Sequence, residues 1–278
     1  MRFFFICLTA VLYNFSVLPS EKNLSLKGDL SQGGLVIGKA PIGTKIKLNN
    51  ENILVSPKGQ FFLGFMHTAK PNQILKAIFP SGKTVEYMLD IKQRDYHTQY
   101  IEGLSKRKVL PNPSDLKRIK KENIALRKAF TRLSKTKLMK DITFSWPTQG
   151  TITGSYGTSR VLNGVPKKAH LAVDIANPVG TIVHAAASGK ILFVHEGMFF
   201  NGKTIIIDHG LNLASVYIHL DNITVKLGDL VNKGDEIGTI GRTGRTTGPH
   251  LHWELRLGRT KLDPKLAVES MSRIFFEP

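Results

Sequence analysis

Cysteine is almost absent from this chain of 278 residues, in which Cys7 is the only one. Cys7 lies inside the N-terminal apolar stretch described below. Once that stretch is removed, the mature chain cannot form a disulfide, ligate zinc through cysteine or use a cysteine nucleophile. Its stability must therefore come from packed cores.

Long apolar runs are equally scarce, because the sequence has only one, at its N-terminus. Residues 1–20 begin with the positive charge of Arg2, followed by an apolar run from Phe3 to Val17 without an acidic residue. Ser20 then provides a small residue at a plausible cleavage site. This pattern is typical of a secretory signal peptide. The run is about as short as a membrane span can be, so we favour cleavage near Ser20 over an uncleaved anchor. We expect an exported protein with no stable membrane span after cleavage.

Acidic residues are few, with 21 Asp and Glu against 39 Lys and Arg, which gives a formal net charge of +18. Such a balance favours partners that carry negative charge: nucleic acid, anionic lipid or a carboxylate-rich polymer. Export and the lack of any nucleic-acid-binding signature argue against nucleic acid as a partner. A solvated, lysine-rich surface without a specific anionic partner is the alternative.

Short alternating runs between Gly, Pro and Asn clusters predict a small N-terminal β domain over residues 21–100. In KTVEYMLDIK (83–92), Val85, Tyr87, Leu89 and Ile91 alternate mostly with polar residues. That period of two is typical of a strand with one buried face. The spacing of the runs suggests a β-sandwich.

Residues 101–140 are predicted to form a basic, Pro-containing linker followed by a connecting α-helix over 114–139. Ser114 is the expected N-cap, Asp115 suits the positive helix end, and no Pro or Gly interrupts the helix. One face is strongly basic. The other carries an apolar stripe that we expect to dock on a domain or a helix: Leu116, Ile119, Asn123, Leu126, Phe130 and Leu133.

Residues 141–270 are glycine-punctuated and again rich in strand patterns, and residues 271–278 form a tail. Strands are expected over 181–187, 189–196, 203–209, 213–220 and 250–257. We predict a compact antiparallel β domain with little helix, so that the fold class of the whole chain is mostly β.

Histidines are concentrated in this last domain, with seven of the nine between residues 170 and 252. His250 and His252 are two apart in an apolar run, so in a strand both imidazoles face the same side. His170 and Asp174 are four apart, which spans about 13 Å in a straight strand. Because zinc–ligand bonds are only ~2.0–2.2 Å, these two residues can share an ion only if the segment bends.

His219 adds a further candidate at the end of a strand-like run, where alternation puts Tyr217 on the same face. A catalytic zinc usually takes three protein ligands and leaves a fourth position for water. The remaining two residues of this set would serve proton transfer and oxyanion stabilisation. Spacing alone leaves open which of the four histidines bind metal.

Over about residues 144–257 the sequence resembles the LytM-domain, or lysostaphin-type, zinc metallopeptidases. The resemblance rests on HLAVD (170–174), KTIIIDHG (203–210), VYIHL (216–220) and above all TGRTTGPHLHWEL (243–255). It implies one Zn²⁺ per chain, with His170, Asp174 and His252 as metal ligands. It also implies that His219 and His250 are the two catalytic histidines that do not bind metal. The family often has Gly where this chain has Ala172, a departure that concerns the shape of the loop.

The resemblance implies an exported zinc metallo-endopeptidase that hydrolyses peptide crosslinks of peptidoglycan, with the stem peptides as its partners. The N-terminal region is similar to exported proteobacterial members, which indicates a periplasmic or cell-envelope location. The alternative is a catalytically inactive LytM-like module that binds the wall or activates another cell-wall hydrolase. The N-terminal domain or the helix would position the enzyme, bind a regulatory partner or block the cleft.

Further residues are candidates for supporting roles, with packing or surface charge as the alternative for each. Phe199 and Phe200 would wall a substrate cleft. Asp208 and Glu254 would hold a ligand histidine in place from behind. The candidates for lining the groove beside the metal are Tyr217, Arg160 and Tyr156.

Overall fold

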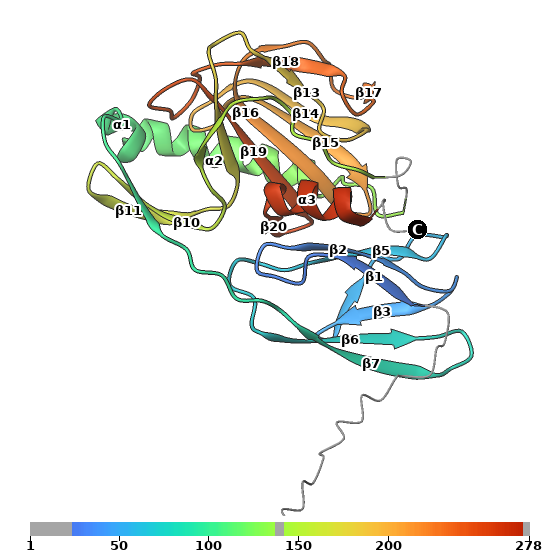
Figure 1. The fold of residues 1–278 in the computed structure, drawn as a ribbon. Coiled ribbons are helices and arrows are strands. Elements are labelled where there is room, and N and C mark those ends of the chain that lie inside the picture. The colour runs from blue at the N-terminus through green and yellow to red at the C-terminus, as the bar shows by residue number, and fades with distance from the viewer. Residues whose placement is uncertain (1–23, 137–141, 275–278) are drawn as a thin grey trace, which may run out of the picture.

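The computed structural model describes residues 24–136 and 142–274, with side chains as far as residue 269. The predicted signal peptide, Cys7 and the predicted helix end at 137–139 lie outside these residues. The described chain is mostly β, as predicted, with a smaller N-terminal unit and a larger C-terminal unit (Figure 1). Among its helices in the described ranges, none has the length and apolar character needed to cross a bilayer.

Two antiparallel sheets build the N-terminal unit, in the orders β1-β2-β5 and β4-β3-β6-β7. Phe61 and Leu63 from the first sheet share a core with Leu75 and Leu89 from the second. The predicted sandwich-like arrangement is therefore confirmed. The strands are β1 (Ser25–Gly28), β2 (Leu35–Lys39), β3 (Lys45–Leu48), β4 (Glu51–Ile53), β5 (Gln60–Gly64), β6 (Asn72–Ile78) and β7 (Thr84–Asp90).

A ten-stranded sheet, antiparallel throughout, forms the C-terminal unit, with β17-β14-β15-β16-β19-β12-β9 as its main path. Its core holds the fully buried Trp253, Ile205 and Leu251. Strands were predicted at the places of β13, β14, β15, β16 and β19. The strands are β9 (Thr151–Gly154), β12 (Val173–Ala176), β13 (Ile182–His184), β14 (Gly189–Met198), β15 (Gly202–Gly210), β16 (Leu213–Ile223), β17 (Leu230–Val231), β18 (Glu236–Ile240), β19 (His250–Leu257) and β20 (Thr260–Leu262).

Helix α2 (Pro113–Phe130) is the predicted connecting helix, but its start differs from the prediction. Its N-cap is Asn112, whose Oδ1 accepts from the backbone N–H of Asp115 at 2.9 Å. Ser114, the predicted cap, instead donates its hydroxyl to Asn112 Oδ1. Pro113 suits the first helical position because that position has no intrahelical partner for an N–H.

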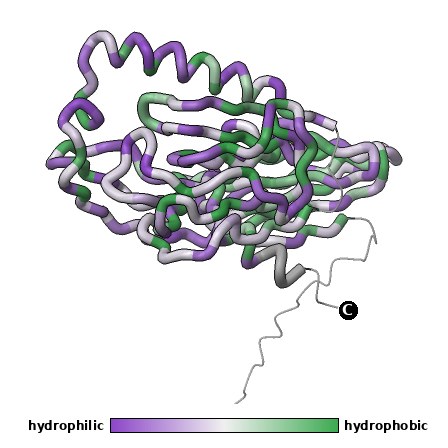
Figure 2. Tube along the Cα trace, turned by 90° about the horizontal axis from the view of Figure 1, so that it is seen from above, coloured by the Kyte–Doolittle hydropathy of each residue, from purple (hydrophilic) through white to green (hydrophobic). Residues whose placement is uncertain are grey.

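The apolar stripe of α2 docks only through its C-terminal half. Ala129, near the end of α2, and Leu133, just after the helix, are buried against Ile206 and Val216 on the outer face of the C-terminal sheet. At the other end Leu116 is exposed. In Figure 2 the long helix at the upper edge is largely hydrophilic, whereas hydrophobic segments concentrate in the strands beneath it.

A third, small sheet joins the linker to the C-terminal unit. Strand β8 (Thr98–Ile101) pairs in parallel with β10 (Thr158–Leu162), which forms a hairpin with β11 (Val165–His170). The sequence analysis put the boundary between the N-terminal domain and the linker at residues 100 and 101. In the structure, residues 98–101 instead form one strand of this sheet. The short helix α1 (Lys106–Val109) follows.

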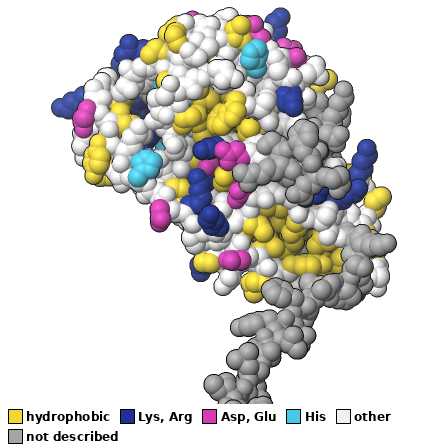
Figure 3. Space-filling view, viewed as in Figure 1, with side chains coloured by type: hydrophobic (Ala, Val, Ile, Leu, Met, Phe, Trp, Pro, Cys, Tyr) yellow, Lys and Arg dark blue, Asp and Glu magenta, His cyan; other side chains and the backbone are white. Residues whose placement is uncertain are grey.

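The two units pack closely, with helix α3 (Pro264–Ile274) between them (Figure 1). The sequence did not predict α3. Asp263, just before it, accepts from the backbone N–H of Lys265 at 3.0 Å and pairs with Arg94 at 2.9 Å. Leu35 and Phe62 of the N-terminal unit extend into the core of the C-terminal unit. Figure 3 shows basic and acidic side chains together at the level where the units meet.

Candidate metal centre

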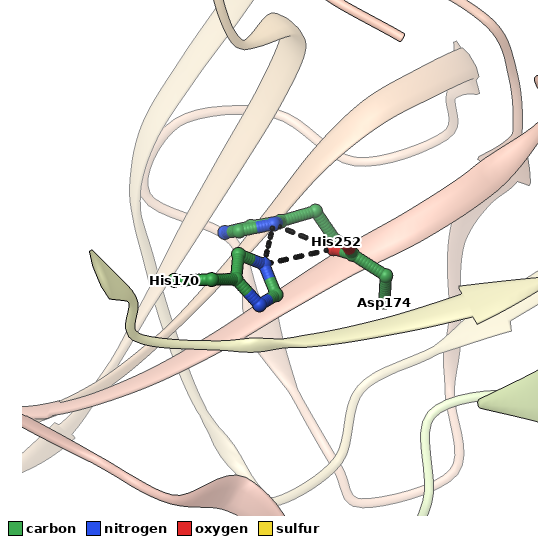
Figure 4. Close-up of side chains that lie close together, drawn as sticks. All are labelled: His170, Asp174 and His252. Atoms are coloured by element: carbon green, nitrogen blue, oxygen red, sulfur yellow. Dashed lines mark hydrogen bonds and ion pairs between the residues drawn. The ribbon is translucent and has the colours of Figure 1, made fainter. Parts of the chain in front are cut away.

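The structure brings together the three residues for which the resemblance implies metal ligation (Figure 4). Asp174 of β12 lies opposite His252 of β19 in the sheet. His170 ends β11, and the chain bends before β12 begins at Val173, as the spacing requires. His170 Nε2 is 3.1 Å from Asp174 Oδ1 and 3.0 Å from His252 Nδ1. His252 Nδ1 is 2.8 Å from Asp174 Oδ1.

Ala172 stands in this bend without strain. It is fully buried, and its φ lies outside the left-handed region that favours glycine. The bend therefore does not require the glycine that the related family often has here.

The donor atoms form a site that suits a metal cation. The carbonyl of Ser155 can only accept, so the contact of 3.2 Å from His170 Nδ1 places the ring proton on that nitrogen. Nε2 is then a bare lone pair, and it faces a carboxylate oxygen that is also an acceptor. Two lone-pair donors at this distance call for a positive charge between them. A set of two imidazole nitrogens and one carboxylate oxygen is typical of zinc sites.

The electrostatics of the site keep two of its donors deprotonated. Burial alone would raise the pKa of Asp174, but its close contacts with the His170 and His252 rings hold that pKa well below its usual value. Burial lowers the pKa of His252 to about 4, although Asp174 acts in the opposite direction. At neutral pH both side chains therefore offer lone pairs to a cation.

Arg160 of β10 contacts the metal centre from behind Asp174. Its Nη2 donates to Asp174 Oδ2, the carboxylate oxygen that faces neither ligand histidine. Its Nε donates to Gln99 of β8 at 3.2 Å. The sequence suggested Arg160 as a groove residue but missed Gln99, because nothing local shows that β8 joins β10.

His219 and His250 lie beside the ligand set and face each other. His219 Nδ1 donates to Thr243 O at 2.8 Å and His250 Nδ1 donates to Gly248 O at 3.0 Å. Their ring centroids are 4.8 Å apart. Burial lowers the pKa of His219 well below its usual value, and the neighbouring His250 and His252 lower it further. These carbonyls place the Nδ1 proton in both rings, so Nε2 is the ring atom that can accept a proton when the imidazole is neutral.

Alternation of side chains breaks at His219, whose φ is +66°. Ile218 and His219 both line the groove, although they are neighbours in one strand. Tyr217, predicted on the His219 face, is instead fully buried, and its hydroxyl accepts from the backbone N–H of Ala186 at 2.9 Å. The prediction for Tyr217 is wrong because the left-handed residue turns the chain over. His250 and His252 keep the expected alternation, with Leu251 and Trp253 in the core.

A groove of about 780 Å³ contains all five site residues. Its walls include Ile101 and Leu104 of the linker, Leu126 and Phe130 of α2, and the predicted Phe200. Phe199 does not line it. That ring is buried and lies under Lys108 Nζ, 4.0 Å from the ring centroid.

Three other suggested residues have different surroundings from those predicted. Tyr156 is buried outside the groove and donates to Lys261 O at 2.8 Å. Asp208 accepts from the backbone N–H groups of Ser134 and Gly210, both at 2.9 Å. Glu254 lines the groove but pairs with Lys261 and Arg256. Within the described residues, neither acid hydrogen-bonds to a ligand histidine.

Fold and site together define a mostly β protein with a His–Asp–His set in a groove, whose donor atoms are close enough to hold a metal ion. The model of peptidase family M23 matches residues 168–264, which contain all five site residues. This part of the chain is thus a domain of peptidase family M23, the LytM-type peptidases.

Two relatives from Vibrio cholerae share this region. "Peptidoglycan DD-endopeptidase ShyB" of Vibrio cholerae is 38% identical over 94 residues, covering 34% of this chain and 22% of the relative. ShyA of the same organism, with the same activity in its name, is 40% identical over 98 residues, covering 34% and 23%. The match thus spans less than a quarter of either relative.

A solved structure matches much more of the chain. This crystal structure from Pseudomonas aeruginosa, described as of the peptidase M23 type, aligns with a TM-score of 0.65 and 28% identity. The alignment covers 87% of this chain and 96% of that one. The likeness therefore extends beyond the M23 domain to most of the N-terminal unit and the helix.

Proposed function

We propose that this chain is an exported, zinc-dependent endopeptidase that hydrolyses peptide crosslinks of peptidoglycan in cell-wall remodelling. The observation that carries the proposal is the convergence of His170 Nε2, Asp174 Oδ1 and His252 Nδ1 beside two further histidines in one groove. The relatives ShyA and ShyB, which are named peptidoglycan DD-endopeptidases, support the substrate class. In this proposal His170, Asp174 and His252 hold one zinc ion.

The chemistry divides between the ion and the protein. Bound zinc would supply Lewis acidity toward the attacking water and the scissile carbonyl. His219 and His250 turn their Nδ1 atoms to backbone carbonyls, which leaves Nε2 of each ring for proton transfer next to the ligand set. Between them they accept the proton of the water and, once protonated, donate to the oxyanion or the leaving amine. Arg160 keeps the Asp174 carboxylate oriented through its second oxygen.

We further propose that the chain is organised by function along its length. Residues 1–20 act as the signal peptide, 21–100 as the N-terminal β domain, 101–140 as linker and helix, and 141–270 as the peptidase domain. Residues 271–278 are the tail. Export would place the mature protein in the periplasm or at the cell envelope. A regulatory partner at the N-terminal domain or helix stays a prediction.

The test is zinc content and cleavage in the same preparations. Purified residues 21–278 are compared with a His170→Ala/His252→Ala variant by elemental analysis, and both are incubated with peptidoglycan sacculi. A His67→Ala/His97→Ala variant controls for the loss of two histidines outside the site. We expect about one zinc per chain and crosslink-cleaved fragments from the wild type and the control alone.

Other outcomes would change the conclusion. Zinc without cleavage would indicate a latent enzyme or a missing activator. A wild type with neither zinc nor cleavage would overturn the proposal and favour the inactive, wall-binding module. The convergence of all five donors argues against that alternative.

A further inference from the structure

The groove beside the metal centre carries an excess of positive charge. Its lining contains several lysines and arginines but only two acidic residues, Asp174 and Glu254. Both acids are already engaged, Asp174 by Arg160 and the proposed ligand histidines, and Glu254 by Lys261 and Arg256. The groove therefore has no carboxylate left to neutralise further cations.

Most of the shielded cations in the groove have partners in the protein. Arg160 pairs with Asp174, and Lys167 donates to Val109 O at 3.0 Å. Arg256 pairs with Glu254 and also lies over the Phe130 ring, 4.0 Å from its centroid. Each of these cations therefore already has a partner within the protein.

Arg245 differs from these residues. It lies in the loop between β18 and β19 and is half-buried in the groove wall. Its guanidinium lies over the Phe200 ring, 4.5 Å from the centroid. Among the residues that the structure describes, none accepts a hydrogen bond from this guanidinium or forms an ion pair with it. Its N–H donors are thus open to the groove, where the acceptor atoms of a ligand can take the place of water.

The backbone holds Arg245 in place. Its backbone N–H donates to Phe200 O at 2.9 Å. Gly244, just before it, has φ +81°, and an added Cβ would lie 2.4 Å from the same carbonyl oxygen. One face of the guanidinium is occupied by the Phe200 ring, so its orientation is restricted before any ligand arrives. Thr243, in the same turn, accepts from His219, which ties this loop to the proposed catalytic residues.

The surroundings of Arg245 select for an anion. Burial lowers the pKa of Arg245, and the positive charge of Arg160 lowers it further, yet a guanidinium remains charged at physiological pH. A planar guanidinium with free N–H edges binds a carboxylate in a bidentate manner. In a peptidase groove, the carboxylate at hand is that of the peptide itself.

We propose that Arg245 forms a carboxylate-binding subsite in the wall of the groove that contains the candidate metal centre. It makes the enzyme selective for peptides that carry a free carboxylate near the scissile amide. This inference rests on the proposed function for its substrate class, and it adds a specificity residue that acts by binding. Stacking on Phe200 and the pinned backbone reduce the entropy lost when the carboxylate binds.

The experiment compares two forms of one ligand, crosslinked peptides released from sacculi with their carboxylates either free or amidated by carbodiimide and ammonia. Their binding to metal-free full-length protein is measured by calorimetry, and their cleavage by the zinc-loaded protein is measured as kcat and KM. The proteins are the wild type, Arg245→Gln and Arg245→Lys. Arg259→Gln is the matched control, because Arg259 is exposed and lies outside the groove.

We expect Arg245→Gln to weaken binding of the free-carboxylate form by about 10- to 100-fold, the usual worth of a charged hydrogen-bonded contact. KM should rise in parallel while kcat changes little. The amidated form should bind wild type and variant alike. Arg245→Lys should recover part of the affinity, because it keeps the charge but not the bidentate geometry. Arg259→Gln should match the wild type.

Equal weakening of both ligand forms by Arg245→Gln, or no weakening of either, would overturn the subsite. Wild-type protein that binds the two forms equally would overturn it as well. Failure of the proposed function looks different. In that case wild-type protein cleaves nothing when zinc-loaded, while metal-free protein still prefers the free carboxylate through Arg245.

Discussion

At the scale of single residues, His219 combines chemistry with an unusual backbone. Its φ of +66° is in the left-handed region, which costs a non-glycine residue on the order of 1–3 kcal/mol. The strain turns two successive side chains, Ile218 and His219, toward the groove. The folded protein is therefore somewhat less stable, but the His219 imidazole faces the groove, which regular strand alternation would not allow.

Two substitutions separate the strain from the chemistry. His219→Ala and His219→Gly should both lower kcat by about 10²- to 10⁴-fold, because each removes a proton-transfer group. Only glycine relieves the left-handed strain, so His219→Gly should be about 1 kcal/mol more stable than His219→Ala. Steady-state kinetics and denaturant unfolding measure the two effects. Zinc content should stay at the wild-type level, and its loss would mean that His219 is a ligand.

His209 gives a second residue-scale prediction, about pH. It is fully buried, with Nδ1 2.8 Å from Ser188 O and Nε2 2.8 Å from Ser215 Oγ. Burial lowers the pKa of His209 to about 4, against about 6.5 in the unfolded chain. Between these values the unfolded state binds a proton that the folded state does not. The stabilisation is therefore complete above about pH 6.5 and is lost as the pH falls toward about 4.

The size of this effect follows from the linkage relation. Between about pH 7.5 and about pH 5 the wild type should lose on the order of 2 kcal/mol through His209. His209→Gln should lose less stability over the same interval. Urea unfolding at both pH values, with a chelator present to remove metal linkage, measures the difference. Equal losses in the two proteins would contradict a buried, neutral His209.

At the scale of elements, helix α2 shows how a cap decides where a helix begins. Ser114 matches the cap pattern, but Asn112 followed by Pro113 starts the helix two residues earlier. An Asn at the cap satisfies the N–H of Asp115, and Pro113 removes one unsatisfied donor. Arg107 then pairs with Asp115 from helix α1, which ties the two helices together.

The two capping assignments predict different mutational costs. Asn112→Ala should destabilise α2 by about 1 kcal/mol, because the Asp115 N–H loses its acceptor. Ser114→Ala should cost much less, since its hydroxyl reaches Asn112 and no backbone N–H. Hydrogen exchange of the α2 amides measures both in the intact protein. A larger effect from Ser114→Ala would restore the original cap prediction.

At the scale of the whole molecule, the N-terminal half completes the peptidase unit. Leu35 and Phe62 enter its core, and α2 covers Ile206 and Val216 on the outer sheet face. The linker strand β8 extends the β10–β11 hairpin, and Gln99 holds Arg160 behind the metal centre. Together these contacts make the linker part of the groove wall.

A truncation tests this dependence. A fragment of residues 140–278 should unfold at a lower denaturant concentration than residues 21–278, because its outer sheet face and part of its core become exposed. The same pair tests whether Ile101, Leu104 and α2 restrain the enzyme. Activity per folded fragment above that of the mature chain would support autoinhibition, and equal or lower activity would rule it out.

The sequence by itself determined whatever depends on near neighbours. The period of two placed the main strands, and it set His250 and His252 on one face because side-chain direction alternates along a strand. Because zinc–ligand bonds are short, His170 and Asp174 can share an ion only if the chain bends between them. The motif resemblance then selected His170, Asp174 and His252 from a larger set of histidines, which spacing alone left open.

Tertiary structure alone decided what depends on distant partners. It joined Gln99 to Arg160, buried Tyr217, paired Glu254 with Lys261 and left Arg245 over Phe200 without an acidic partner. No local pattern encodes these outcomes, because each depends on which surfaces meet when remote segments pack. The left-handed turn at His219 belongs here too, since its cost is sustained only by the contacts around it.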